Sequence, residues 1–398
     1  MPMNNQPWSM YDRMTAVLQG CKPDRHPFVT RLETWYKSHQ RSGTLPERFK
    51  ELSLNEVHRA VGVGQLKFMV PYGLKLRGVE VSASFEGEPF YHAWEPVYEN
   101  FPGLWDIVSN EKAGETISEL RTPVGALHLR HVILPEGIYT GTDPYLKEHL
   151  IQEDGDYRTV EYILERAEYI PLYDKLAAEQ ARLGDVAFVV PLPHRIPFQQ
   201  VLLEYIGEIN LFYALHDTPH KVKRLLDLLD QQMVEILHRL SDFNWPYVEF
   251  PDNLHGLMTN PKLFSEYCLP AYQRYTDILH AQGKVVGSHT DGDMKSLLGL
   301  LKDSGLDICE SFSPAPLTRC TFEDAWMAWQ GGPLIWGGIP SPILEESIPE
   351  EDCMRYVQEV LDRVDGQTII LGVVDLFMRH NSIDRVQTIA RKVENFRI

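Results

Sequence analysis

Acidic and histidine side chains gather at the ends of several apolar runs in this chain. The runs are YVEF, VVGSH, DICESF and TIILGVV, and the polar residues at or after their ends are Glu249, Asp252, Asn253, His255, His289, Asp291, Glu310 and Asp375. A carboxylate at the end of a buried strand costs free energy unless it is paired, protonated or bound to a cation. Several runs that deliver such groups together therefore favour a shared site that holds a metal ion.

The tripeptide His289-Thr290-Asp291 is the most specific local pattern. Residues i and i+2 of an extended segment point to the same side, so this imidazole and this carboxylate can bind one ligand. In isolation the pattern favours Asp291 orienting a hydrogen-bonded His289, or both residues capping the next helix. With Glu310 and Asp375 expected on neighbouring strand ends, it favours a metal held by these four residues. Histidine with carboxylates suits Zn²⁺, with one position open for substrate or water.

Basic and aromatic residues near two other apolar runs could form a substrate pocket. Arg31, Trp35 and Tyr36 follow the first run, and His194 and Arg195 follow a later one. Arg195 could hold a carboxylate through two parallel hydrogen bonds, and a structural pair with an acid of the chain is an equal alternative. For Trp35, packing in the core is favoured over a place in a pocket wall.

The elements that must position these residues alternate along the chain. Eight runs are typical of strands, most of them apolar throughout, as strands buried on both faces are. They cover residues 26–31, 67–73, 185–191, 247–252, 284–291, 307–313, 334–340 and 368–375. Long segments with helical periodicity lie between them, including 156–184 and a helix that begins after Thr218-Pro219. This order predicts an α/β fold, a (β/α)8 TIM barrel with its chemistry at the carboxyl ends of the strands.

Residues 76–135 depart from this alternation. Their apolar residues recur with a period of two on both sides of a TPVG turn, which predicts antiparallel β-hairpins. We interpret the segment as a sheet inserted near the mouth of the barrel. Because no low-complexity linker interrupts the chain, we expect a single TIM-barrel domain over residues 1–398, with an N-terminal extension and this β insertion.

The composition excludes several classes of protein. The chain has 398 residues, and 38 Lys and Arg against 56 Asp and Glu give a net charge of −18, which argues against nucleic acid or an anionic membrane as partner. Five cysteines without a CxxC pair argue against a disulfide framework.

Cys309, which precedes Glu310 and so points to the opposite face of its strand, is expected to be a buried thiol. The chain shows no apolar signal or membrane segment, so a cytoplasmic location is expected.

The chain resembles the uroporphyrinogen decarboxylase superfamily. The stretch EFPDNLHGLMTNPKLF continues to VVGSHTDGD in the order that this family shows: an acidic strand end, an N/S-P-x-x-F helix, a further helix, a Gly-Lys strand and an H-x-C-G type loop. The opening MTAVLQGCKPDRHPFV is similar to the family's R-x-x-x-x-x-x-G-x-x-P-D-R-x-P start. The resemblance runs over nearly the whole chain and implies a TIM barrel.

This superfamily contains porphyrinogen decarboxylases and zinc-dependent methyltransferases that work with corrinoid proteins. In the methyltransferases H-x-C and a later Cys bind zinc, whereas here Asp291 stands at the first Cys and Asp375 near the second. The R-Q-A-G-R-Y segment of the decarboxylases, which binds propionate groups, is replaced by RLETWYKSHQRSG. The chain is similar instead to the aryl methyl ether O-demethylases of anaerobes, including the LETWY and TLPERF region, whose zinc is thought to be held by carboxylates and histidine.

The resemblance implies the methyltransferase component of an O-demethylase. Such an enzyme moves a methyl group from a methoxylated aromatic compound to the Co(I) corrinoid of a partner protein, with Zn²⁺ as the Lewis acid. The candidate catalytic residues are Glu249, Asp252 and Asn253. The candidate substrate-binding residues are Arg31, Trp35, Tyr36, Tyr72, Tyr139, His194, Arg195 and His255. Relatives are often dimers, so a homodimer is a further expectation.

Two alternatives stay open at this point. A decarboxylase of an acidic substrate would use Arg31 and Arg195 to bind carboxylates and Asp252 or Asp375 to manage the proton. A barrel that only binds a small molecule would hold no metal and would tolerate alanine at its rim carboxylates.

Overall fold

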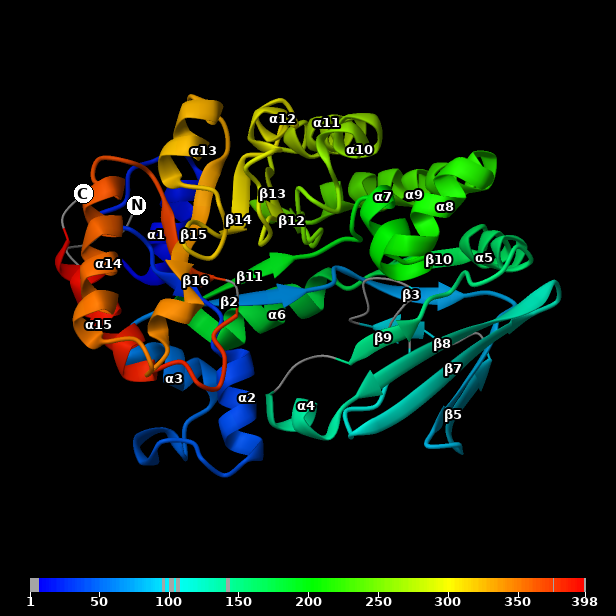
Figure 1. Cartoon of the computed structure of the whole chain (residues 1–398), viewed down its shortest axis with the longest axis horizontal. Helices are drawn as coiled ribbons and strands as arrows, with labels where there is room; N and C mark the ends of the chain where they lie inside the picture. The colour runs from blue at the N-terminus through cyan, green and yellow to red at the C-terminus, as the bar shows by residue number, and fades with distance from the viewer. Residues whose placement is uncertain are drawn as a thin grey trace.

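Parallel strands carry most of the candidate site residues. The computed structural model describes residues 7–94, 97–99, 104, 108–140, 144–374 and 376–396. Within them, one parallel sheet has the order β12 (Tyr247–Phe250), β13 (Val285–His289), β14 (Ile308–Phe312), β15 (Leu334–Pro340) and β16 (Ile370–Val374). A second has the order β1 (Val29–Thr30), β2 (Gly64–Met69) and β11 (Ala187–Pro191). A parallel bridge between Phe28 and Leu371 joins the two sheets (Figure 1).

The two parallel sheets surround one apolar interior. Each of their eight described strands contributes a side chain to it: Val29, Leu66, Val190, Tyr247, Val285, Ile308, Trp336 and Ile370. Helix α1 (Met10–Leu18) packs Met14 and Val17 into the same cluster. The eight predicted strand positions are therefore confirmed as parallel strands of one mixed α/β fold. Among the described residues no backbone ladder joins β11 to β12, so a fully closed barrel stays a prediction.

Two elements differ from their predicted extent. The run 67–73 is not one strand, because β2 ends at Met69 and β3 (Tyr72–Leu76) begins after Pro71, which has no N–H for a ladder. Segment 156–184 is not one helix, since β10 (Ala167–Pro171) separates α5 (Asp156–Leu164) from α6 (Tyr173–Leu183). Strand β10 pairs antiparallel with β3, and this tertiary pairing overrides the helical pattern.

Antiparallel strands occupy most of residues 76–135, the segment whose apolar residues recur with a period of two. They form a sheet with the order β5 (Glu88–Trp94), β4 (Glu80–Phe85), β7 (Gly114–Thr122), β8 (Gly125–Ile133) and β9 (Tyr145–Glu148). Thr122 pairs with Gly125 across the TPVG turn. Strand β6 (Val97–Glu99) pairs with β3. Figure 1 shows this sheet to one side of the parallel strands, reached through β3.

Most helices lie outside the parallel strands, but α1 packs against the interior cluster and α5 contacts β7 and β8 of the antiparallel sheet. Besides α1, α5 and α6, they are α2 (Glu33–Arg41), α3 (Leu54–Val61), α4 (Pro135–Thr140), α7 (Pro197–Gln200), α8 (Glu208–Asp217), α9 (Pro219–Arg239), α10 (Pro261–Leu263), α11 (Leu269–His280), α12 (Leu298–Lys302), α13 (Phe322–Trp329), α14 (Glu350–Val364) and α15 (Ile383–Asn395). Helix α9 begins at Pro219, as predicted. In the described part of the chain, no helix has the length and apolar character needed to cross a membrane.

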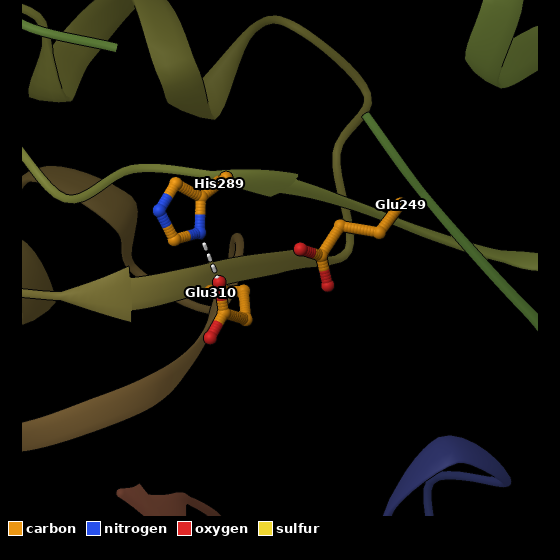
Figure 2. Close-up of side chains that lie close together, drawn as sticks. All are labelled: Glu249, His289 and Glu310. Atoms are coloured by element: carbon orange, nitrogen blue, oxygen red, sulfur yellow. Dashed lines mark hydrogen bonds and ion pairs between the residues drawn. The ribbon is translucent and has the colours of Figure 1, made fainter. Parts of the chain in front are cut away.

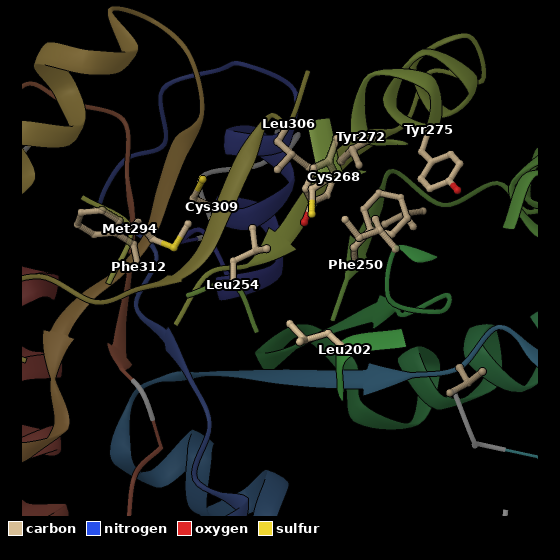
Figure 3. Close-up of a cluster of buried hydrophobic side chains, with 14 of the residues drawn as sticks. Leu202, Phe250, Leu254, Cys268, Tyr272, Tyr275, Met294, Leu306, Cys309 and Phe312 are labelled. Carbon is tan, nitrogen blue, oxygen red and sulfur yellow. The ribbon is translucent and has the colours of Figure 1, made fainter. Parts of the chain in front are cut away.

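The layer between strands and helices is a second apolar cluster. Phe250, Cys309 and Phe312 project into it from β12 and β14, and Tyr272 meets them from α11 (Figure 3). Cys309 is buried there, as predicted, and burial raises the pKa of its thiol. Side chains therefore alternate along β12 and β14 between this outer layer and the interior.

Candidate metal centre

Glu249, His289 and Glu310 come together at the carboxyl ends of three neighbouring strands. Glu249 lies two residues after Tyr247, and Glu310 two residues after Ile308, so both continue the inward-facing positions of β12 and β14. The parallel register places His289 beside Glu310. Figure 2 shows the two carboxylates turned toward the imidazole.

The three side chains offer ligand atoms at the separation that one metal ion requires. One ligand atom from each lies within 4.8 Å of the other two. Glu249, His289 and Glu310 have exposed fractions of 0%, 8% and 5%. The Nδ1 atom of His289 is paired with Oε2 of Glu310. We call these three residues the triad.

The electrostatics of the triad suit a cation. Burial raises the pKa of Glu249 well above its ordinary range, and the neighbouring Glu310 raises it further. Burial alone would lower the pKa of His289, but Glu310, Asp291 and Glu249 raise it to about 9. Oε1 of Glu249 is buried and has no hydrogen-bond partner among the described residues. An unsatisfied carboxylate oxygen beside a second acid marks a place where positive charge is needed.

Tyr247 and Gly287 hold Glu249 in place. The Tyr247 hydroxyl donates a hydrogen bond of 2.8 Å to Oε2 of Glu249. Gly287 faces Glu249 in the register, and a Cβ at this position would lie 2.0 Å from the Tyr247 hydroxyl oxygen. The phenol therefore fills the space of a missing side chain, and only glycine leaves room for it.

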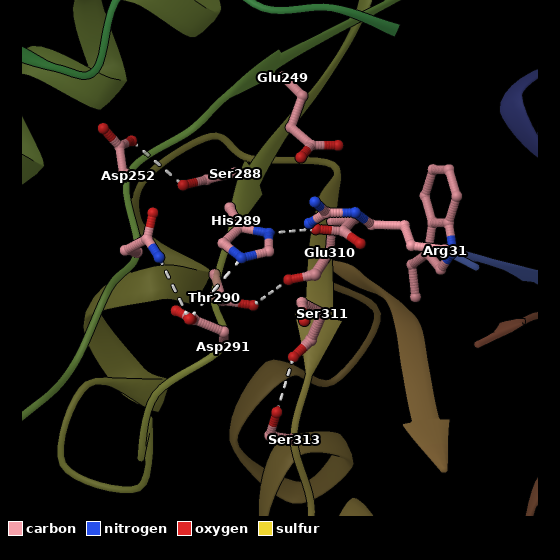
Figure 4. Close-up of polar contacts among 12 residues, drawn as sticks. Arg31, Glu249, Asp252, Ser288, His289, Thr290, Asp291, Glu310, Ser311 and Ser313 are labelled. Carbon is pink, nitrogen blue, oxygen red and sulfur yellow. Dashed lines mark hydrogen bonds and ion pairs between the residues drawn. The ribbon is translucent and has the colours of Figure 1, made fainter. Parts of the chain in front are cut away.

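A chain of polar side chains approaches His289 from the loop after β11. Arg195 donates to Glu204 at 2.9 Å and to the Asn253 side-chain oxygen at 2.7 Å. Asn253 donates to Oδ2 of Asp291 at 3.2 Å, and this oxygen lies 3.7 Å from Nε2 of His289 (Figure 4). Asp291 therefore lies beside the imidazole, outside the group whose ligand atoms meet within 4.8 Å.

Two residues next to the site have backbone conformations that side chains rarely adopt. Asn253 has φ of +50° and Ser311, which follows Glu310, has φ of +60°. The pairing between β14 and β15 shifts its register across Ser311. Such conformations cost free energy and persist where the surroundings impose them, which is common at functional sites.

The predicted metal ligands are brought together only in part. His289 and Glu310 are in the triad, and Asp291 is beside it. Glu249, which the sequence analysis names as a catalytic residue, supplies the third ligand atom instead. Asp375 lies outside the described residues.

Asp252 is not directed at the triad. One of its oxygens accepts from the Ile196 N–H at 2.8 Å, and the other from Tyr272 at 2.5 Å and Ser288 at 3.2 Å. Tyr272 belongs to the outer layer, and Asp252 is fully buried there. Asp252 thus joins the loop after β11 to β13 and α11, and its catalytic role stays a prediction.

Arg31 and His255 lie where a substrate could meet them. The Arg31 guanidinium donates to Glu33 at 2.9 Å and points toward Glu310 (Figure 4). His255 and Asp291 line a groove of about 490 Å³ with Leu317 and its neighbours. A groove of this volume can hold a small molecule.

The remaining predicted substrate-binding residues have other surroundings. Trp35 is buried against Phe49 and Phe377, which is the core packing favoured for it from the sequence. The Tyr36 hydroxyl donates to the Leu52 carbonyl at 2.7 Å.

Tyr72 and His194 form a buried aromatic cluster with Tyr169, whose hydroxyl lies 3.2 Å from Nε2 of His194. Burial lowers the pKa of His194 to about 3. Tyr139 lies exposed on α4. These three residues are therefore not shown to face the triad.

Comparisons with known proteins agree with this fold. Residues 207–373 match the family model of uroporphyrinogen decarboxylase (URO-D), and this segment contains the triad. The chain is similar to the solved structure of a methyltransferase from Methanosarcina mazei, with a TM-score of 0.55 and 11% sequence identity over 98% of this chain and 99% of that chain. At this identity the likeness shows a shared fold. A comparison with curated proteins found no match.

Proposed function

We propose that this chain, whose residues 207–373 match the family model of uroporphyrinogen decarboxylase, is a methyltransferase of that superfamily. In detail, we propose the methyltransferase component of an O-demethylase. The C–O bond of a methoxylated aromatic compound breaks, the methyl group passes to the Co(I) corrinoid of a partner protein, and the aromatic product leaves as a phenolate.

The triad is the observation that carries this proposal. Two carboxylates and one imidazole offer ligand atoms within 4.8 Å of one another, and one buried carboxylate oxygen has no hydrogen-bond partner in the described part of the chain. Oxygen and nitrogen donors of this kind fit Zn²⁺, which in such a site supplies Lewis-acid polarisation of a bound ether oxygen. Cys309 points away from the triad, so the described strand ends offer no thiolate to soften the ion.

Residues around the triad have defined tasks in this proposal. Tyr247 holds Glu249 by its hydrogen bond, so the carboxylate keeps one orientation. Arg31 lowers the pKa of Glu249, against the larger effect of burial, and so favours its ionised form. Asp291, held by Asn253, stands beside Nε2 of His289 and limits the rotation of the ring.

The alternative decarboxylase function has less support. It needs Arg31 and Arg195 to bind substrate carboxylates, but Arg195 is already paired with Glu204 and Arg31 with Glu33. Asp252, its candidate for proton transfer, has both oxygens in hydrogen bonds.

Metal analysis followed by a methyl-transfer assay tests the proposed function. We expect about one zinc per chain and transfer from a methoxybenzene to a Co(I) corrinoid protein. His289→Ala should lose the metal and at least about 100-fold of the rate. His216→Ala, which alters an exposed histidine of α8, serves as the matched control. A metal-free preparation with full activity, or carbon dioxide release without a corrinoid, would contradict the proposal.

A further inference from the structure

The line of polar side chains that leads to the triad begins at a buried acid, Glu204. This residue is 2% exposed and lies in a π-helical turn, Val201–Tyr205. Such turns are rare and frequently occur at functional sites. Oε1 of Glu204 accepts from Nε of Arg195 at 2.9 Å, and the Arg195 side chain is itself largely buried. The acid therefore fixes the position of the guanidinium from its buried side.

The amide of Asn253 has one favourable orientation in this line. Its oxygen accepts from Nη1 of Arg195 at 2.7 Å, and its Nδ2 donates to Oδ2 of Asp291 at 3.2 Å. A flipped amide would place its NH2 group against a guanidinium and its oxygen against a carboxylate, so neither contact could be a hydrogen bond. The cation on one side and the anion on the other therefore orient the amide. We call Glu204, Arg195, Asn253 and Asp291 the relay.

The two ring nitrogens of His289 have different surroundings. Nδ1 is paired with Oε2 of Glu310, within the triad, whereas Nε2 lies 3.7 Å from Oδ2 of Asp291 (Figure 4). At this distance the attraction between Nε2 and Asp291 is electrostatic, because a hydrogen bond is shorter. A histidine that binds a metal through one nitrogen keeps its proton on the other, which commonly faces a carboxylate. Here the relay places that carboxylate at Nε2.

We propose that the relay selects the ring nitrogen of His289 that binds the metal: it keeps the ring proton on Nε2, beside Asp291, and presents Nδ1 to the ion. Glu204, which the sequence analysis does not name, is then a positioning residue that acts on the metal through the other three members. Arg195 and Asn253 serve the same end. This inference rests on the proposed function, because it concerns the zinc ion of that function.

Competition for Zn²⁺ with a chelator tests the relay at its centre and at its buried end. Asn253→Gly removes the middle side chain, and glycine readily adopts the φ of +50° found at this position. Glu204→Gln removes the terminal charge with little change in volume. For both variants of the full chain we expect the Kd for Zn²⁺ to rise by about tenfold or more. Glu208→Gln, an exposed acid of α8, is the matched control and should leave the Kd unchanged.

Nuclear magnetic resonance of the zinc-loaded chain, labelled at the histidine ring nitrogens, identifies the bound atom of His289. Metal-bound and protonated ring nitrogens have different chemical shifts, and the His289 signals are assigned by their absence from His289→Asn. We expect zinc on Nδ1 and the proton on Nε2 in the unaltered chain, and a fraction of rings bound through Nε2 in Asn253→Gly. A relay that only stabilises the fold would lower the free energy of unfolding and leave the bound nitrogen unchanged.

The outcomes separate this inference from the proposed function. Zinc bound through Nε2 in the unaltered chain contradicts the inference and leaves the proposed function in place. Unchanged zinc affinity in Asn253→Gly does the same, and this variant decides the matter if Glu204→Gln does not fold. Zinc binding that depends on the relay, without any methyl transfer, overturns the proposed function and leaves the inference in place. A chain that binds no zinc contradicts both.

Discussion

Two buried carboxylates at the end of β12 have opposite surroundings. Glu249 faces the interior, where Glu310 lies nearby, and Oε1 of Glu249 has no hydrogen-bond partner within the ranges that the structure describes. Asp252, three residues later, faces the outer layer, where three donors from separate elements satisfy both of its oxygens. Both side chains are fully buried. Burial of an acid is therefore no sign of function here, and the difference lies in what surrounds it.

The contrast shows how a buried carboxylate can either stabilise the fold or form part of a candidate metal site. The hydrogen bonds to Asp252 offset part of its desolvation, although burial still raises its pKa, so Asp252 can contribute to the fold without any ligand. Glu249 receives one phenolic hydrogen bond and the charges of His289 and Arg31, which offset burial and repulsion from Glu310 only in part, so a bound cation would add the missing compensation. Variants at each position can break or sharpen this comparison.

Glu249→Gln should have the largest effect on metal binding. The change removes a charged ligand, so we expect the Kd for Zn²⁺ to rise by more than roughly 100-fold, beyond the effect of losing an outer partner. Stability of the metal-free protein should stay equal or increase, because the amide cannot ionise beside Glu310, where burial already disfavours the charged carboxylate. Competition with a chelator and urea unfolding measure the two quantities. Glu136→Gln, on exposed α4, is the control. Unchanged metal affinity would show that Glu249 does not bind the metal.

Asp252→Asn should show the reverse behaviour. The amide cannot accept the same set of hydrogen bonds, so the free energy of unfolding should fall by about 2–3 kcal/mol. Metal content per folded chain should not change. Urea unfolding and elemental analysis provide the measurements. A stable variant that has lost its metal would transfer the functional role from Glu249 to Asp252.

Tyr247→Phe should weaken metal binding by about tenfold, since outer partners that orient a ligand contribute that much or more. The variant keeps the ring in the space above Gly287, so a large loss of stability is not expected. Gly287→Ala is the matched variant, because its methyl group would lie 2.0 Å from the Tyr247 hydroxyl oxygen. It should lose both metal affinity and stability. Equal metal affinity in Tyr247→Phe and the unaltered chain would show that Glu249 binds the metal without the Tyr247 hydrogen bond.

The smallest expected effect concerns a buried imidazole away from the triad. Burial lowers the pKa of His58 to about 4, against a smaller opposite effect of Glu33. The unfolded chain, with a histidine pKa near 6.5, then binds the proton first, so stability is lost as the pH falls from about 6.5 toward 4. His58→Leu should remove about 1 kcal/mol of the loss between pH 7 and pH 5.5. Urea unfolding at both pH values checks this, and His216→Ala should leave the loss unchanged.

Part of the site could be predicted from the sequence because strand ends are local features. His289 and Glu310 follow apolar runs directly, and parallel strands bring their carboxyl ends to one edge. The place of Glu249 in the triad had an available signal, since its spacing of two from Tyr247 puts both side chains on the inward face of β12. The role of Asp252 had none, because its partners come from the loop after β11, from β13 and from α11.

The fold shows the same division. Eight strand positions were predicted from apolar runs, and their parallel pairing is observed. The breaks at Pro71 and at β10 were missed, although Pro71 is a visible signal. Strand β10 forms because β3 offers it a partner across nearly a hundred residues of chain, which helical periodicity cannot reveal.

The sequence by itself determined the strand series, the polar residues at its ends and the absence of paired cysteines, because these follow from residue type and short-range spacing. The tertiary structure decided which carboxylates face one another and which are satisfied. It also decided that the side chains of Gln180 and Trp245 satisfy backbone groups of β11. These properties depend on contacts among strands far apart in the chain, and such contacts exist only once the strands surround a common interior.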